Sequence, residues 1–107
     1  MKAILRYSAI LVCACAVASA CAEPVASVYK TKCAACHGAV GDASTPAGKA
    51  LKVPSFTSEA VLKETDDNLL AIAKNGKGKM PAWHDKLSDE QLKDLIAFIH
   101  ELQKKSQ

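Results

Sequence analysis

Several features that would define other classes of protein are scarce or missing in this sequence of 107 residues. Three of its five cysteines (Cys13, Cys15 and Cys21) lie at or near the N-terminus, so too few remain for a disulfide-stapled secreted domain. We find no paired carboxylates at a suitable spacing, no nucleophile with a base and no phosphate-binding loop, so no enzyme active site is recognisable. The length allows one domain and leaves no room for a second core.

Residues 1–22 are predicted to be a removable signal peptide. Lys2 and Arg6 lie in a short basic start, and residues 8–18 are uncharged, apolar and too short to span a bilayer comfortably. Small-x-small cleavage patterns follow at residues 18–20 and 20–22. We therefore expect an exported, periplasmic protein whose folded domain comprises residues 23–107.

Cys21 leaves a second form of processing open. Residues 18–21 resemble a bacterial lipoprotein box, although Ala18 stands where leucine is usual. In that case the signal would comprise residues 1–20, and an acyl chain on Cys21 would anchor the protein. Membrane association is therefore expected only if Cys21 is lipidated.

Little net charge remains after the signal peptide. Of fourteen basic residues, Lys2 and Arg6 lie in that segment, which leaves twelve against eleven acidic residues and a formal net charge of +1. Nucleic-acid binding therefore has no support. Lysines at positions 74, 77, 79 and 86 bracket Met80, a pattern typical of a docking face or of a solvated loop.

The first half of the domain predicts one helix followed by a long loop. Pro24 can open a helix whose apolar residues recur at helical spacing up to residues 33–37. Glycines and prolines then interrupt any regular pattern over residues 38–56. So long a loop needs something to pack on.

The second half predicts further helices around an irregular segment. Residues 76–83 cannot be a regular helix, so Met80 and Trp83 are presented from a loop. Residues 88–91 form a capping box ahead of an apolar stripe. The expected helices are 58–64 after a cap at Thr57 or Ser58, one from a cap at Asp66 or Asp67 to Asn75-Gly76, and 88–102. The sequence therefore predicts an all-α domain of about four helices with no strand and too little core of its own, which a large apolar cofactor would complete.

The run Cys33-Ala34-Ala35-Cys36-His37 is the strongest chemical signal. Cys-x-x-Cys-His is the signature of c-type haem attachment, in which two thiols add to the haem vinyl groups and the histidine binds the iron. A thioredoxin-like redox pair would need a strand-helix-strand context that is absent. A zinc site would need two further ligands, for which only His84 and His100 are available.

The wider pattern resembles a class I monohaem bacterial c-type cytochrome. The residues that carry the resemblance are 29–38, 78–83, 87–92 and 96–99. It implies a small cytochrome c fold wrapped around one covalently bound haem c, with residues 23–107 as the cytochrome c domain. It also implies that Met80, in a loop well after the motif, is the second axial ligand opposite His37; a thioether favours ferrous iron.

Other assignments of Met80 stay open at this stage. A lone methionine is usually core filler. His84, four residues further on, could replace Met80 if the loop shifts, whereas His100 falls well off the centre of its apolar stripe. The order of preference for the sixth ligand is Met80, His84, His100.

The resemblance assigns structural roles to further residues. Tyr29 and Phe98 match an aromatic contact between the first and last helices. The family usually has glycine near Val25, so the crossing is either wider here or uses Ala26.

Two residues are expected in the haem environment. Pro46 matches a proline whose carbonyl accepts a hydrogen bond from the proximal histidine, with Pro54 as the fallback. Trp83 would either donate its indole N–H to a haem propionate or cover the haem edge.

The expected function is one-electron transfer between redox partner proteins, with the haem cycling between ferric and ferrous states. With both axial positions filled, the iron has no open site for a substrate, so we expect a carrier and not an enzyme. Two alternatives stay open: a cytochrome subunit of a larger periplasmic oxidoreductase complex, and a haem-based ligand sensor or weak peroxidase. Both the donor and the acceptor remain unidentified.

Overall fold

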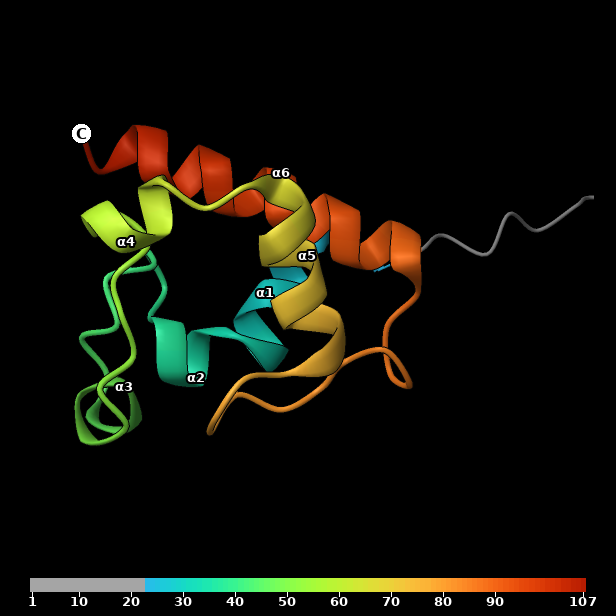
Figure 1. Ribbon diagram of the computed structural model, residues 1–107, viewed down its shortest axis with the longest axis horizontal. Helices are drawn as coiled ribbons and strands as arrows, with labels where there is room; N and C mark the ends of the chain where they lie inside the picture. The colour runs from blue at the N-terminus through green and yellow to red at the C-terminus, as the bar shows by residue number, and fades with distance from the viewer. Residues whose placement is uncertain (1–22) are drawn as a thin grey trace, which may run out of the picture.

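The computed structural model describes residues 23–107, so the predicted signal peptide and Cys21 lie outside the described residues. Six α-helical elements and no named strand are present in that range (Figure 1). They are α1 (Val25–Lys32), α2 (Ala34–His37), α3 (Pro46–Ala50), α4 (Glu59–Leu62), α5 (Asp66–Asn75) and α6 (Asp89–Lys105). The all-α prediction is confirmed. The number of helices exceeds the prediction because the first helix is divided at Cys33 and the loop after the motif contains one short helix, α3.

The first helix runs into the Cys-x-x-Cys-His motif with a single interruption. Pro24 lies at the N-cap of α1, and its carbonyl accepts a hydrogen bond from the Val28 N–H at 3.1 Å. Cys33 breaks the helical geometry with φ −118°, but its carbonyl accepts the His37 N–H at 3.0 Å. α2 therefore continues almost directly from α1.

The caps of the short helices agree only in part with the sequence prediction. Ser58 caps α4, as one of the two predicted candidates. The cap of α5 is Thr65, whose hydroxyl accepts the Asn68 N–H at 3.2 Å, so the predicted cap at Asp66 or Asp67 is wrong. Both aspartates lie in the first turn instead, where their charge interacts favourably with the positive end of the helix.

Helix α6 is the longest element and packs on both α1 and α5. The predicted capping box is present: the Gln91 N–H donates to Ser88 Oγ at 3.1 Å, and the Ser88 N–H donates to Gln91 Oε1 at 2.9 Å. Its apolar stripe is buried at Leu92, Leu95 and Leu102.

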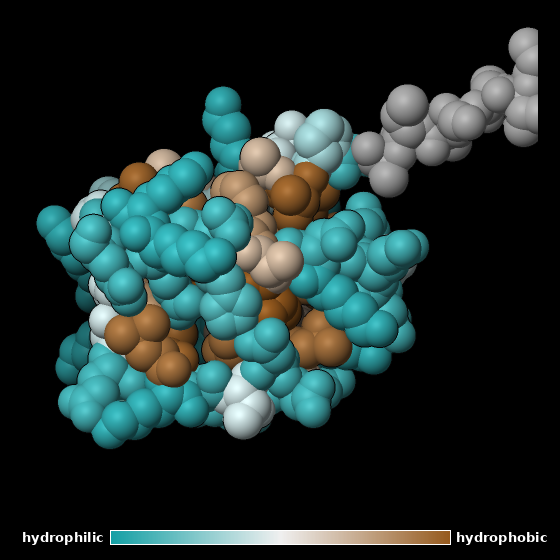
Figure 2. All heavy atoms as spheres, turned by 90° about the horizontal axis from the view of Figure 1, so that it is seen from above, coloured by the Kyte–Doolittle hydropathy of each residue, from teal (hydrophilic) through white to brown (hydrophobic). Residues whose placement is uncertain are grey.

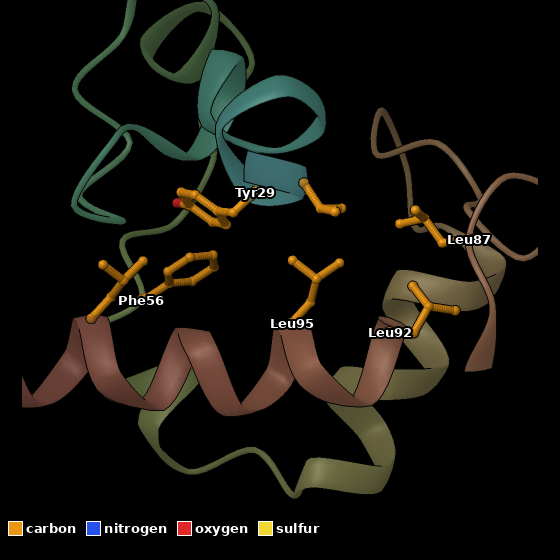
Figure 3. Packing of buried hydrophobic residues seen from close by; sticks show 7 residues of the cluster. Tyr29, Phe56, Leu87, Leu92 and Leu95 are labelled. Atoms are coloured by element: carbon orange, nitrogen blue, oxygen red, sulfur yellow. The ribbon is translucent and has the colours of Figure 1, made fainter. Parts of the chain in front are cut away.

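The core lies mainly between α1 and α6. Tyr29 of α1 lies over Phe56, Leu95 of α6 follows in the middle of the cluster, and Leu92 of α6 lies at its other end near Leu87 (Figure 3). The predicted aromatic contact is present, because the rings of Tyr29 and Phe98 lie 5.0 Å apart at 48°.

The sequence left open how the first and last helices cross without a glycine near position 25. Val25 packs against the core cluster, whereas Ala26 is exposed and takes no part. The crossing therefore accommodates a branched side chain where the family usually has glycine.

The face of the molecule on which α6 lies is mostly hydrophilic, with smaller apolar patches in between (Figure 2). Within residues 23–107, no helix has the length and hydrophobicity needed to cross a membrane.

Candidate functional site

Cys33 and Cys36 stand at the start and near the end of one helical turn, and both are free thiols with partly buried side chains. Burial raises the pKa of the Cys33 thiol to about 11, and the positive charge of Lys32 acts in the opposite direction. The two thiols therefore lie within one helical turn of each other, as attachment of a cofactor through two thioethers requires.

His37, the last residue of α2, has the properties of a metal ligand. Its ring stacks on Phe56 with centroids 4.7 Å apart and planes at 19°. Burial lowers the pKa of His37, so its imidazole is neutral near neutral pH and keeps a lone pair for a metal. Its Nδ1 is buried without a hydrogen-bond partner in the part of the chain that the structure describes.

The segment after the motif folds back over α2. The Ala43 N–H donates to the His37 carbonyl at 2.8 Å, and the Thr45 hydroxyl donates to the Ala35 carbonyl at 2.7 Å. From the other side, the buried Tyr29 hydroxyl donates to a carbonyl at Gly38 at 2.6 Å. The long loop thus packs on the motif itself, as its length led us to expect.

Gly48 allows the closest approach in this region. A Cβ atom there would overlap the Cys36 carbonyl oxygen and lie 2.5 Å from the Ala43 carbonyl oxygen. Because both obstacles are backbone atoms, a side chain cannot be accommodated by rotation. Glycine is therefore required for α3 to pack against α2.

Neither of the two prolines expected near His37 accepts a hydrogen bond from its ring nitrogen Nδ1. Pro46 is the exposed first residue of α3, and Pro54 is also exposed. Among the described residues no carbonyl accepts a hydrogen bond from His37 Nδ1, so the bond to Pro46 stays a prediction.

Met80 lies half-buried in a tight turn that begins at the C-terminal end of α5. The backbone N–H and carbonyl groups of Lys77 and Met80 pair with each other at 2.9 and 3.2 Å. Gly76 ends α5 with φ +77°, and a Cβ there would lie 2.6 Å from the Met80 carbonyl oxygen. The predicted loop setting of Met80 is confirmed.

The rest of this loop is attached to α5 through its backbone. The Trp83 N–H donates to the Ala73 carbonyl at 3.1 Å, and the His84 N–H donates to the Lys74 carbonyl at 3.2 Å. These carbonyls belong to the last turn of α5, where helical partners run out. The C-terminal end of α5 therefore fixes the loop that carries Met80.

Trp83 is half-buried against the core and attracts two lysines. The Nζ atoms of Lys32 and Lys86 lie 5.6 and 5.3 Å from its ring centroid. This contact joins the end of α1, next to Cys33, to the Met80 loop. The sequence did not reveal Lys32 as part of the site, because no local pattern relates positions 32 and 83. Of the lysines that bracket Met80, Lys74 pairs instead with Asp89 at 3.0 Å.

The rival histidines have other partners. His84 is exposed, and its Nδ1 lies 2.9 Å from Asp85 Oδ1. His100 has both ring nitrogens engaged, by Asp66 at 2.7 Å and Gln103 at 2.9 Å. Residues 23–107 also bring together no group of three or more histidine, cysteine or acidic side chains that would hold a metal ion such as zinc.

Comparison with known proteins identifies the family to which this chain belongs. A family model described as cytochrome c oxidase, cbb3-type, subunit III matches residues 20–99 of the chain. This chain belongs to the monohaem c-type cytochromes. The cytochrome carries electrons by means of one covalently bound haem c, and its partners are redox proteins.

Individual relatives fall into two groups. The cytochrome c6 of Bryopsis maxima is 34% identical over 79 residues, which is 69% of this chain and 83% of that protein. The cytochrome c6 of Leptolyngbya boryana is 36% identical over 72 residues, covering 67% and 81%. The cbb3-type cytochrome c oxidase subunit CcoP of Azospirillum brasilense is 35% identical over 86 residues, covering 78% of this chain but only 29% of the subunit.

A solved structure supports the fold of the cytochrome. The KustC0563 c-type cytochrome superposes with a TM-score of 0.68 at 23% identity, covering 75% of this chain and 98% of that one. The residues also fit haem c: two free thiols, a partly buried neutral imidazole and a thioether on a nearby loop are the donor set that this cofactor takes.

Proposed function

We propose that Cys33 and Cys36 carry the haem, that His37 and Met80 are its axial ligands, and that the cytochrome passes single electrons between redox partners. The observation that carries this proposal is the single turn of helix that holds two free thiols and a partly buried imidazole whose Nδ1 is buried without a partner. When bound, the haem supplies an iron that alternates between ferric and ferrous states.

The protein residues have separate tasks in this scheme. Each cysteine adds its S–H across one vinyl group, which gives a thioether without any oxidant. His37 offers a neutral nitrogen, and its ring is held by the stack on Phe56. Met80 offers a soft sulfur that favours the ferrous state. Both His84 and His100 are engaged by carboxylates, which favours Met80 over either as the sixth ligand.

Pro46, Pro54 and Trp83 remain candidates for the surroundings of the haem. The unpaired His37 Nδ1 leaves a donor for which Pro46, or failing that Pro54, is the proposed carbonyl partner in the loaded protein. Trp83 either donates its indole N–H to a propionate or covers the haem edge. None of the three takes part in a chemical step.

The two axial ligands also define what the cytochrome does not do. With both positions filled, no coordination site is left for a substrate, which supports a carrier and argues against an enzyme or a ligand sensor. An absorption spectrum of the purified protein, oxidised and reduced, tests this directly. Low-spin haem with a weak methionine-to-iron band at the red end of the visible spectrum is expected, and a high-spin spectrum that binds carbon monoxide at once would refute the proposal.

A second candidate function is a cytochrome subunit of a larger periplasmic oxidoreductase complex. The match to the cbb3-type subunit III model and to part of CcoP favours it. Gentle extraction of native membranes followed by gel filtration separates the two. A subunit would elute with other polypeptides at high mass, whereas a free carrier would elute alone.

We also propose that residues 1–22 are a signal peptide and that the exported form comprises the cytochrome c domain of residues 23–107. Intact-mass analysis of protein from its native host tests this. An unmodified N-terminus at or after Ala22 is expected for a periplasmic carrier. A mass that includes an acylated Cys21 would show the lipid-anchored form and a signal of 1–20 instead.

A further inference from the structure

Gln103 is the one buried polar side chain recorded in the described part of the chain, and it bonds at both ends. Its Nε2 donates to the carbonyl of Phe56 at 2.9 Å, across 47 positions of sequence. Its Oε1 lies 2.9 Å from Nδ1 of His100, one turn earlier in α6. A buried amide with both ends paired is costly to disturb.

Phe56 is held by two backbone hydrogen bonds, and its ring stacks on His37. Its N–H donates to the Gly41 carbonyl at 2.8 Å, and its carbonyl receives the Gln103 amide. Its ring stacks on the His37 imidazole at 4.7 Å. Gln103 thus fixes one of the two backbone anchors of the residue that covers the proximal ligand.

The hydrogen-bond partners determine the protonation of His100. A carbonyl only accepts, so Gln103 must turn its NH₂ toward Phe56 and its oxygen toward His100 Nδ1. An ionised carboxylate also only accepts, so Asp66 requires a proton on His100 Nε2, 2.7 Å away. Both ring nitrogens must therefore donate, which only the imidazolium form can do.

The charges around His100 agree with this assignment. Asp66 and Asp67 of α5 and Lys93 of α6 line the same groove as His100, and the charge of Lys104 of α6 also acts on His100. The hydrogen bond to Asp66, followed by that to Gln103, raises the pKa of His100, whereas partial burial and, more weakly, the charge of Lys104 lower it. The network is therefore complete at low pH and is lost as the pH rises through a pKa above the ordinary histidine value.

We propose that Gln103 is a positioning residue that couples protonation of His100 to the packing of Phe56 on His37, so that the midpoint potential of the cytochrome depends on pH. The inference rests on the proposed role of His37 as an iron ligand. Loss of the proton leaves His100 with one donor, which stays on the carboxylate because that bond is charge-assisted. Nδ1 then faces the Gln103 oxygen, lone pair against lone pair, and the Gln103 anchor of Phe56 is released.

The direction in which the midpoint potential shifts follows from how far His37 is exposed to water. A looser Phe56 admits water to the proximal ligand, and a more polar surrounding favours the ferric state, whose charge is higher. The potential should therefore fall as the pH rises through the titration of His100.

The test uses the holoprotein and measures midpoint potential over about pH 5 to 8, where histidines titrate. The wild type should show the fall, whereas Gln103→Leu should have the lower potential throughout and lose most of the pH dependence. Gln91→Leu, which breaks a glutamine hydrogen bond at the other end of α6, should keep the wild-type profile. Asp66→Asn should move the inflection to lower pH, and Asp67→Asn, which alters the same charge without the hydrogen bond, should move it much less.

A coupling by charge through space would leave the pH dependence intact in Gln103→Leu, and that result would overturn the proposal. If that variant fails to fold, NMR titration of His100 in the wild type decides. Unequal pKa values in the ferric and ferrous states are expected, and equal values would overturn the coupling. A red methionine-to-iron band in the wild type shows separately that the proposed haem site is intact.

Discussion

The two regions that supply iron ligands are built in different ways. His37 lies in a region held by many buried backbone contacts, where residues 38–56 wrap the motif and Gly48 meets Cys36 directly. Met80 lies in a short, largely exposed loop that depends on Gly76, two carbonyls at the end of α5 and one contact between Trp83 and two lysines. The proximal side should therefore resist perturbation of its surface, whereas the Met80 side should respond to small changes.

The largest effect is expected from removing both thiols. Cys33→Ser with Cys36→Ser should release the haem entirely and prevent cooperative folding, because the chain has little core without it. Acid-organic extraction followed by a haem assay checks attachment. Haem that is already extractable from the unmutated protein would contradict the assignment.

The second prediction concerns the weaker region. Met80→Ala should abolish the red charge-transfer band, lower the midpoint potential and open the iron to carbon monoxide or cyanide, because the soft thioether is lost. His84→Ala, in the same loop, is the matched control and should change little. A high-spin haem in His84→Ala, with an unchanged spectrum in Met80→Ala, would show that two histidines bind the iron.

Two glycine substitutions compare the regions directly. Gly48→Ala should cost about 1–3 kcal/mol of unfolding free energy, because its Cβ meets backbone atoms near Cys36. Gly76→Ala should instead weaken the methionine band before the fold is lost, since its Cβ meets the Met80 carbonyl. Guanidinium unfolding, followed at the red band and by circular dichroism, separates the two effects.

Lys49→Ala, an exposed change in the same helix as Gly48, is the control for this pair and should leave both signals unaltered. A Gly48→Ala protein as stable as the wild type would show that α3 can move away from α2 at no cost.

The smallest effect is expected at the contact between the regions. Lys32→Met and Lys86→Met each remove a cation from the Trp83 ring while keeping an apolar stem, at about 0.5–1 kcal/mol each. The loss should appear as earlier disappearance of the methionine band in denaturant. Lys79→Met, which removes an exposed lysine of the same loop, should have no such effect. An equal loss in all three variants would show that the net positive charge, and not the contact with Trp83, stabilises the loop.

Local sequence patterns determined most of the helices and the attachment motif. The capping box at Ser88, the end of α5 at Gly76 and the Cys-x-x-Cys-His turn each depend on residues within four positions of one another. Such patterns act through local backbone geometry and need no knowledge of the rest of the chain. The sequence predicts the cap of α5 one or two residues too late, because Thr65 and the adjacent aspartates are all good capping residues.

Only the tertiary structure decided what surrounds the ligands. Four contacts join positions 19 to 51 residues apart: Phe56 on His37, Lys32 on Trp83, His100 with Asp66, and Gln103 with Phe56. The tertiary structure also placed Pro46 at the start of a short helix, capped by Thr45, that no sequence pattern had predicted. Contacts of this kind depend on how helices pack, and side-chain identity along the chain does not encode that packing locally.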